Sequence, residues 1–559
     1  MLCAIMRIPV TLLLAAAAFL VLVNLGHVAF WDDEAHVALF GRALLASHHN
    51  LAWDGRNLVP SQNGSWLDKD LLQIFPQLDN YVAAASFAVF GDSPWAGRLP
   101  FALCGIASLV VFWRLLLLEF PGFPTLQLYA LACASLSAPL LLYFRNCRYY
   151  GLSVLLTMTI LLLYRRFLQS RRMLDAVLIG LLAGVLSLNS VLNCACLVGA
   201  LVLRHLLFHR RELSLRDWLK ISVTLLIGAA FTIPYVLTCI VPMFEPVREY
   251  SKSVHLPPNF PLREFLPLML WRNINGINEG NALPWSLGLC LLAFIFWKHP
   301  KEAESAKSRQ MALELLTMVV GFVLVLSTCS PQNAAASSLP DVRYLTPILP
   351  VIAALMGVVF WWIHQRSRIV AATLLLTYLC TNLLGTTPST PGLRYPLPEF
   401  CLEILNPYPT ACSETCDYLR ANSRQDDTLW FYPDWMGKPL MYYIGDRIKL
   451  RGILDQNTFL PKPAAERLEP DFFIENVFPN WVVSFGRHQE VNSTVAGFCR
   501  TLPGTNTAYH YTRVKVIDVY WDQIQRPELA FHSFGPWHGF DKAAGSVYIF
   551  KRSETPLPR

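Results

Sequence analysis

Three consecutive carboxylates, Asp32, Asp33 and Glu34, directly follow an apolar run at residues 8–30 that is long enough to cross a bilayer. A segment with helical character follows them at residues 35–45. A carboxylate at the membrane face, partly shielded from water, can act as a general base toward a hydroxyl or an amine. The alternative is that these acids are solvated and cap a helix, because Asp is frequent at helix starts. Asp33 and Glu34 are the candidate catalytic residues, and Asp32 is a candidate substrate contact.

Basic residues are expected on the same side of the membrane as these acids. Four of them are candidates for holding a phosphate: Lys69, Arg145, Arg148 and Arg343. The two arginines of the 145–150 loop stand at the outer end of two apolar runs, where cations are rare, so they should have an anionic partner. A phosphate and an acidic loop residue are both suitable partners. An anionic lipid headgroup would suit the whole cluster at the membrane interface.

Three further residues are candidate acceptor or donor contacts: Tyr149, Tyr344 and Arg248. Each tyrosine follows a candidate arginine directly in the sequence. Arg248 lies in a long polar loop at residues 241–283, which is expected on the same outer face.

The sequence offers little evidence for a metal site. Asp68 and Asp70 flank Lys69, and an Asp-x-Asp pair can bind a divalent cation, although an ordinary charged loop has the same composition. No pair of CxxC units and no His/Cys pattern indicates zinc. Four cysteines in the C-terminal part could form one or two disulfides if that part is exported: Cys401, Cys412, Cys416 and Cys499.

The composition is that of a membrane protein. Of the 559 residues, 54% are hydrophobic and only 15% are charged, whereas soluble globular proteins carry roughly 25% charged residues. The formal net charge of +7 does not indicate a nucleic-acid partner, because most of the excess Lys and Arg lies in short loops between apolar runs.

The apolar runs predict a polytopic α-helical membrane protein with about eleven transmembrane helices. The first run, at residues 8–30, is too long for the apolar core of a signal peptide and is interpreted as an uncleaved span. The others lie at 98–118, 126–144, 149–164, 174–188, 190–204, 218–240, 284–297, 311–328, 342–363 and 369–385. Residues 77–90 are apolar but short, which suits a surface helix within an extracytoplasmic loop at 31–97.

The charges of the loops indicate the orientation. Four basic loops fall on one side of the membrane if residues 77–90 do not cross it: Arg165 to Arg172, Arg204 to Arg216, Lys298 to Arg309, and Arg366 with Arg368. The positive-inside rule makes that side cytoplasmic. The N-terminus is then cytoplasmic, and the acidic stretch and the candidate arginines face outside.

The character of the chain changes after residue 385. Residues 386–409 are rich in proline and predict a linker between domains. Residues 410–559 alternate short apolar runs with amphipathic stretches, which predicts a small α/β domain. An odd number of spans after a cytoplasmic N-terminus makes this domain extracytoplasmic.

The order of these motifs resembles that of the GT-C glycosyltransferases. The resemblance rests on Asp33-Glu34 after the first span, Lys69, the stretch from Phe90 to Arg98, Arg148-Tyr149-Tyr150, and Arg343-Tyr344-Leu345-Thr346-Pro347. It covers residues 1–385 and is nearest to the protein O-mannosyltransferases and the bacterial lipid A aminoarabinose transferases. The proline pair that usually follows the lysine is replaced here by Asp70-Leu71.

This resemblance implies a catalytic transmembrane domain at 1–385 in a bacterial inner membrane. Its donor would be a polyprenyl-phosphate-linked sugar, and its acceptor a protein, lipid or glycan of the cell envelope. Asp33 would be the base or orient the acceptor, with Glu34 assisting, while Lys69 would hold the donor phosphate. The second acidic metal motif of the oligosaccharyltransferases has no counterpart here, so no cofactor and no divalent metal is expected. A single base predicts inversion at the anomeric carbon.

Two other functions fit parts of the sequence. A transporter or flippase of a lipid-linked anionic substrate would use the same cations. Transporters, however, usually carry their charges near the bilayer midplane and consist of related halves, which this sequence does not show. A structural membrane protein whose exported domain recruits partners would not explain the acids and cations that are expected on the outer side of the membrane.

Overall fold

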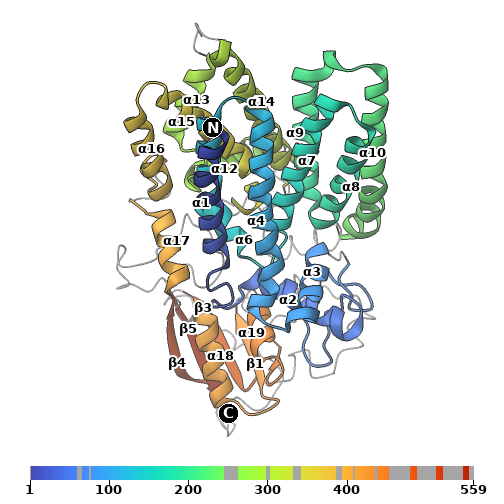
Figure 1. Cartoon of the computed structure of the whole chain (residues 1–559). Helices are drawn as coiled ribbons and strands as arrows, with labels where there is room; N and C mark the ends of the chain where they lie inside the picture. Colours follow the sequence, from blue (N-terminus) through green and yellow to red (C-terminus); the bar gives the residue numbers. More distant parts are fainter. Residues whose placement is uncertain are drawn as a thin grey trace.

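The chain forms a bundle of helices with an α/β domain at one end (Figure 1). The computed structural model describes residues 2–59, 64, 66–74, 77–243, 262–296, 303–330, 342–385, 393–406, 410–432, 437–451, 479–486, 511–519 and 545–552. The start of helix α1 and the sheet lie at opposite ends of the bundle in Figure 1. The α/β domain is therefore at the end where α1 leads into the acidic stretch.

Apart from the helix at Leu262–Glu279, each helix of the bundle overlaps a predicted apolar run. They are α1 (Leu2–Leu22), α4 (Pro94–Glu119), α5 (Pro124–Ser135), α6 (Ala138–Phe144), α7 (Tyr150–Ser170), α8 (Met173–Asn189), α9 (Val191–Arg204), α10 (Leu215–Tyr235), α12 (Leu262–Glu279), α13 (Trp285–Phe296), α14 (Ala303–Cys329), α15 (Leu349–His364) and α16 (Arg368–Cys380). A 3-10 helix, η7 (Val342–Ile348), leads into α15, and a short π-helix, η2 (His205–His209), extends α9. The predicted α-helical membrane architecture is confirmed.

In the described part of the chain, fewer helices than the eleven predicted spans are long and apolar enough to cross a membrane on their own. Within the described residues, six helices are long and apolar enough to cross a membrane, or seven if α5 and α6, bent by 53°, form one broken span. Helices α1, α8, α13 and α16 are apolar but shorter. The eleven spans expected from the sequence require these four to cross as well, so that number stays a prediction.

Two features of the bundle differ from the sequence-based expectation. The 241–283 region, expected as a loop, contains α12. The segment expected as one span at 126–144 is broken between α5 and α6. The break has a local cause, because Ser137 caps α6 by accepting from Leu140 N and Pro139 occupies the first turn.

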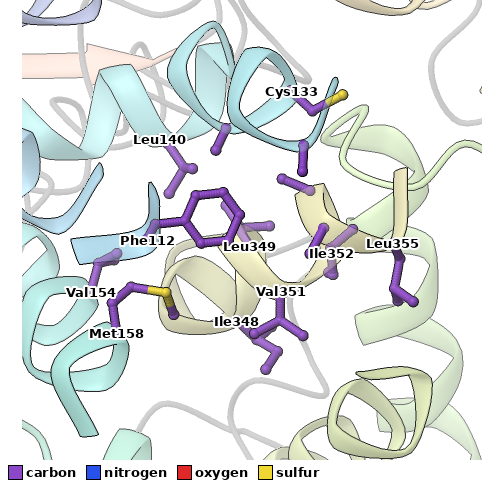
Figure 2. Close-up of a cluster of buried hydrophobic side chains, with 14 of the residues drawn as sticks. Phe112, Cys133, Leu140, Val154, Met158, Ile348, Leu349, Val351, Ile352 and Leu355 are labelled. Carbon is purple, nitrogen blue, oxygen red and sulfur yellow. The ribbon is translucent and has the colours of Figure 1, made fainter. Parts of the chain in front are cut away.

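Helix α15 is the centre of the apolar core. Its residues from Leu349 to Trp361 are all buried, as expected for a helix that is hydrophobic on every side. Figure 2 shows Leu349 of this helix beside Phe112 of α4, with Leu140 of α6 close to both. A Cβ atom at Gly357 would lie 2.6 Å from the Ala130 Cβ of α5. Small residues therefore let these two helices approach closely, which is a common device in membrane bundles.

A polar region joins the bundle to the α/β domain. It contains α2 (Asp32–Ser47) and α3 (Leu78–Phe90), which lie at the same end of the bundle as the sheet (Figure 1). The segment between them folds back on itself through isolated bridges such as Leu51 with Leu72.

The C-terminal part is the predicted α/β domain. Its strands are β1 (Thr428–Tyr432), β2 (Lys449–Leu450), β3 (Trp481–Gly486), β4 (Tyr511–Val519) and β5 (Gly545–Arg552), in the order β2-β1-β3-β5-β4. Strand β1 is parallel to both of its neighbours, and β5 is antiparallel to both of its own. Its helices are α18 (Ala411–Asn422) and α19 (Gly437–Ile444). A further helix, α17 (Pro396–Leu405), lies within the stretch expected as a linker.

The structure describes three of the four cysteines that could form disulfides in the C-terminal part. Cys401, Cys412 and Cys416 are free thiols in the structure, and Cys499 lies outside the described residues.

Candidate active site

Asp33 lies in the first turn of α2 and faces two arginines from other parts of the chain. Arg343 Nη1, from η7, donates to Asp33 Oδ2 at 3.1 Å. Arg148 Nη2, from the loop between α6 and α7, lies 3.9 Å from Asp33 Oδ1. Burial alone would raise the pKa of Asp33, but the surrounding cations, Arg148 and Arg343 foremost, outweigh burial and hold that pKa well below its usual range. Asp33 is therefore ionised throughout the neutral pH range.

A second carboxylate shares Arg148. Asp79, in the first turn of α3, has no exposed surface, and its Oδ2 lies 3.8 Å from Arg148 Nη1. The same nitrogen donates to Gln77 Oε1 at 3.3 Å. Burial raises the pKa of Asp79 to about 6 in spite of the nearby guanidinium. Asp79 is not among the residues predicted from the sequence, although its place as a lone acid inside an apolar segment was an available signal.

Glu34 faces away from Asp33 and into the bundle. Arg98 of α4 donates to it twice, from Nε to Oε1 at 2.8 Å and from Nη2 to Oε2 at 2.6 Å. The backbone N–H of Cys147 donates to Oε1 at 2.7 Å. The remaining N–H groups of Arg98 donate to backbone carbonyls, among them Val28 O at 2.7 Å. Glu34 is 1% exposed, so its carboxylate ties α2 to α4 and does not face the space beside Asp33.

Asp32 has a partner from the C-terminal domain. Lys438 Nζ, from the first turn of α19, lies 2.8 Å from Asp32 Oδ1. Lys438 is not among the residues predicted from the sequence, because a single lysine in an α/β domain belongs to no motif.

Arg145 is occupied by the end of α1. Its Nη1 donates to Leu20 O, Val21 O and Val23 O at 2.8 to 2.9 Å. The last carbonyls of a helix generally lack partners within it, and a cation there also interacts favourably with the helix dipole. The structure thus places Arg145 as a cap of α1, apart from the Asp33 cluster.

Lys69 lies on the surface of the loop between α2 and α3. The neighbouring Asp68 accepts from the backbone N–H groups of Asp70 and Leu72 at 2.8 and 2.9 Å, so it forms a turn. Within the described residues, no hydrogen bond or ion pair connects the Lys69 side chain to Asp33, Arg148 or Arg343. No group of three or more His, Cys, Asp and Glu side chains suited to a metal is found in the part of the chain that the structure describes.

The two candidate tyrosines lie beside their arginines. Arg148 is 5.5 Å from the ring centre of Tyr149, and Arg343 is 4.9 Å from that of Tyr344. Such cation–π contacts restrict the positions of the guanidinium groups. Arg248 lies outside the described residues.

A buried polar network connects α2 to α3 and to the segment before α3. Gln73 Nε2 lies 3.3 Å from His36 Nε2, and Asn80 Nδ2 donates to Gln73 Oε1 at 2.9 Å. Burial lowers the pKa of His36, and the nearby Lys438 and Arg148 lower it further. His36 is therefore a neutral, structural imidazole.

An apolar cavity of about 530 Å³ lies between α7, α8, α9 and α10, which stand side by side in Figure 1. Its lining reaches from Leu186 and Val191 at the α8–α9 turn to Phe167 and His205 near the other ends of the helices. The α8–α9 turn adjoins the Arg148 loop, because Asn189 Nδ2 donates to Tyr149 O at 3.1 Å. The cavity therefore extends away from the candidate active site along the bundle.

Comparisons with known proteins find one family model that matches part of the chain and several solved structures with a similar fold. Residues 76–238 match the model of a family described as dolichyl-phosphate-mannose-protein mannosyltransferase. No curated protein sequence matches the chain.

Solved structures with a similar fold cover nearly the whole chain. ArnT from Cupriavidus metallidurans in the apo state has 16% sequence identity and a TM-score of 0.52, over 97% of both chains. The same protein bound to undecaprenyl phosphate has 15% identity and a TM-score of 0.52, again over 97% of both. The oligosaccharyltransferase of Archaeoglobus fulgidus in complex with Zn and sulfate has 14% identity and a TM-score of 0.50, over 90% of this chain and 72% of that one. The family match over residues 76–238 and the similarity in fold confirm the resemblance of the motifs to those of the GT-C glycosyltransferases.

Proposed function

We propose that this protein is an integral-membrane glycosyltransferase that moves a sugar from a polyprenyl-phosphate carrier to an acceptor outside the membrane. The observation that carries the proposal is the ionised Asp33 between Arg148 and Arg343, at the end of a GT-C bundle. The structure of ArnT bound to undecaprenyl phosphate supports a lipid-phosphate carrier. The acceptor would be a protein, a lipid or a glycan of the cell envelope.

In this proposal the donor phosphate binds to Arg148 and Arg343. Planar guanidinium groups suit phosphate oxygens, and both side chains are only 10 to 14% exposed. An arriving phosphate would compete with Asp33 for the same N–H groups. The pKa of Asp33 would then rise from its depressed value toward the ordinary one, which makes the carboxylate a better base when the donor is in place.

The transfer itself is a single displacement. The acceptor hydroxyl or amine attacks the anomeric carbon while the bond from that carbon to the phosphate oxygen breaks. Asp33 takes the proton of the acceptor, and the lipid phosphate leaves with the electron pair, its charge stabilised by the arginines. Attack on the face opposite the leaving group inverts the anomeric configuration. No step in this scheme requires a metal.

The other candidates take supporting roles. Glu34 assists by fixing α2 through Arg98, and Arg145 fixes the end of α1 that leads into the acidic stretch. Lys69 remains a predicted ligand of the donor phosphate, and Tyr149 and Tyr344 remain predicted acceptor or donor contacts. We further propose that the α/β domain and the active site face the outside of a bacterial inner membrane, with the N-terminus in the cytoplasm.

The first test measures sugar transfer in isolated membranes with labelled polyprenyl-phosphate sugars. Asp33→Asn should reduce the rate at least about 100-fold, because it removes the only base of the scheme. The matched control is Asp417→Asn, which makes the same change at a side chain that is 76% exposed on α18, and it should transfer at the wild-type rate. The anomeric configuration of the product should be opposite to that of the donor.

The rival function gives a different result in the same assay. A transporter or flippase would move the lipid-linked substrate across the membrane and transfer no sugar to any acceptor. Equal transfer by wild type and Asp33→Asn would disprove the role of Asp33 while leaving the enzyme in place.

A further inference from the structure

We propose that Lys438 of the C-terminal domain is a positioning residue of the active site. It holds Asp32, and with it the first turn of α2, so that Asp33 meets the acceptor. The inference rests on the proposed glycosyl transfer and extends it. The C-terminal domain is then a component of the catalytic site, rather than a separate module that recruits an acceptor.

The first observation is that the three adjacent carboxylates pair with cations from different parts of the fold. Consecutive residues of a helix point about 100° apart, since a turn holds 3.6 residues. Asp32 pairs with Lys438 of the C-terminal domain at 2.8 Å. Asp33 pairs with Arg343 of η7, and Glu34 pairs with Arg98 of α4. Three separate parts of the fold thus restrain one helical turn.

These restraints matter because the turn would otherwise be loose. Three like charges in a row repel one another, and the helix N-terminus offsets only part of that repulsion. The side chains of Lys438 and Asp32 are only 12% and 20% exposed. A shielded pair of this kind restrains its partners more than a solvent-exposed pair does. Loss of the pair would let the first turn of α2 shift, and Asp33 would shift with it.

The second observation is that α19 is fixed to the polar region around α2. The backbone N–H of Phe30 donates to the Tyr443 hydroxyl at 2.8 Å. The Tyr442 hydroxyl donates to Asp92 Oδ1 at 2.5 Å. Arg42 of α2 binds the same carboxylate and lies 4.1 Å from the Tyr442 ring centre. The helix that carries Lys438 therefore has a defined position against α2.

A third contact extends this docking beyond α19. Asn57 has no exposed surface, and its side chain crosses between the two parts of the chain. Its Nδ2 donates to Gly445 O at 2.8 Å, and its Oδ1 accepts from Leu450 N at 2.7 Å. Buried polar contacts with specific partners favour one orientation of the domain.

The test compares variants of the full-length protein in the transfer assay. Lys438→Gln should lower kcat about 10-fold, because small displacements of a reacting group are costly, and leave the KM for the donor within about 2-fold. Lys438→Arg should recover most of the rate by restoring the charge. The matched control is Lys515→Gln, at an exposed position of β4 in the same domain, and it should behave as wild type.

A double-mutant cycle with Asp32→Asn tests whether Lys438 affects the transfer rate through its pair with Asp32. If Lys438 acts through Asp32, the double variant should be no slower than Lys438→Gln alone, because both changes remove the same pair. A merely structural role predicts losses that multiply and that fall in parallel with thermal stability. That result would overturn the proposal.

The remaining outcomes are also decisive. Wild-type rates in Lys438→Gln would overturn the inference while leaving the proposed function intact. If Lys438→Gln does not fold, Asp32→Asn breaks the pair from its other side, and a folded Asp32→Asn with the wild-type rate would overturn it equally. Absence of transfer by the wild-type protein with every polyprenyl-phosphate sugar would contradict the proposed function itself.

Discussion

At the residue scale, adjacent carboxylate side chains have different surroundings within one helical turn. Asp32, Asp33 and Glu34 are adjacent acids, yet Glu34 is buried against Arg98 while Asp33 keeps 21% of its side chain exposed. A group that reacts must be reached by substrate, whereas a structural ion pair is best shielded from water. Exposure therefore separates Asp33 from Glu34, which charge and sequence position do not distinguish.

Asp79 gives a prediction about pH and stability. Its pKa in the folded protein is about 6, above the ordinary value of 3.8. The folded state therefore binds this proton more tightly than the unfolded chain. Ionised Asp79 then disfavours the folded state fully above about pH 6, and the penalty fades as the pH falls from 6 toward 3.8.

Asp79→Asn should therefore raise thermal stability at pH 7.5. At pH 5 the gain should shrink by roughly half, since the wild-type residue is then largely protonated in the folded state. Unfolding curves of the purified protein in detergent at the two pH values measure this. A variant that is less stable than wild type at pH 7.5 would show that the ion pair with Arg148 outweighs the cost of burial.

At the element scale, four helices enclose an apolar cavity that suits a lipid chain. The cavity between α7, α8, α9 and α10 is lined almost wholly by apolar side chains, and its outer end adjoins the Arg148 loop through Asn189. A donor whose phosphate is held by Arg148 could place its isoprenoid chain there. Burial of apolar chain surface would then contribute to donor affinity.

Gly228 of α10 lines this cavity, and a Cβ atom there would meet only ordinary contacts, the nearest being Gly180 O at 3.7 Å. Gly228→Leu should raise the KM for a long-chain polyprenyl donor about 10-fold, equivalent to about 1.4 kcal/mol. A donor with only one or two isoprene units should be unaffected. Gly288→Leu is the matched control, because its surroundings on α13 are also open. An equal change for both donors would argue against a chain site.

At the scale of the whole molecule, buried ion pairs stabilise both ends of the bundle. At the end opposite Asp33, Arg204 Nη2 donates to Glu119 Oε1 at 3.0 Å and to Glu314 Oε2 at 2.8 Å. Arg98 and Glu119 belong to the same helix, α4, and their separation along it is about 30 Å at 1.5 Å per residue. The two clusters tie α4 to different neighbours.

Arg204→Met should lower thermal stability strongly without altering the active site. Removing one partner of a buried pair leaves uncompensated charge and costs about 3–5 kcal/mol in soluble proteins. The transfer rate per folded molecule should stay at the wild-type value because of the distance from Asp33. Arg114→Met, at an exposed position of the same helix, should change neither quantity. A fall in the rate per folded molecule would indicate that the two ends are coupled.

The sequence by itself determined the kind of molecule. Apolar runs of bilayer length predicted the helical bundle, and alternating runs predicted the α/β domain. These inferences about the fold succeed because a bilayer demands long apolar segments. Charges at the ends of such segments are conspicuous, and they made Asp33, Arg148 and Arg343 candidate site residues, whose roles stay a prediction.

Only the tertiary structure decided which charges meet. Arg145 and Arg148 are three residues apart, yet the first caps α1 and the second faces Asp33. Lys438 carried no pattern that would connect it to this site, and the only signal of Asp79 was its place as a lone acid inside an apolar segment. Side-chain direction changes by about 100° with each helical residue, and partners come from distant parts of the chain. Contacts of this kind depend on packing, which residue type and spacing along the sequence do not specify.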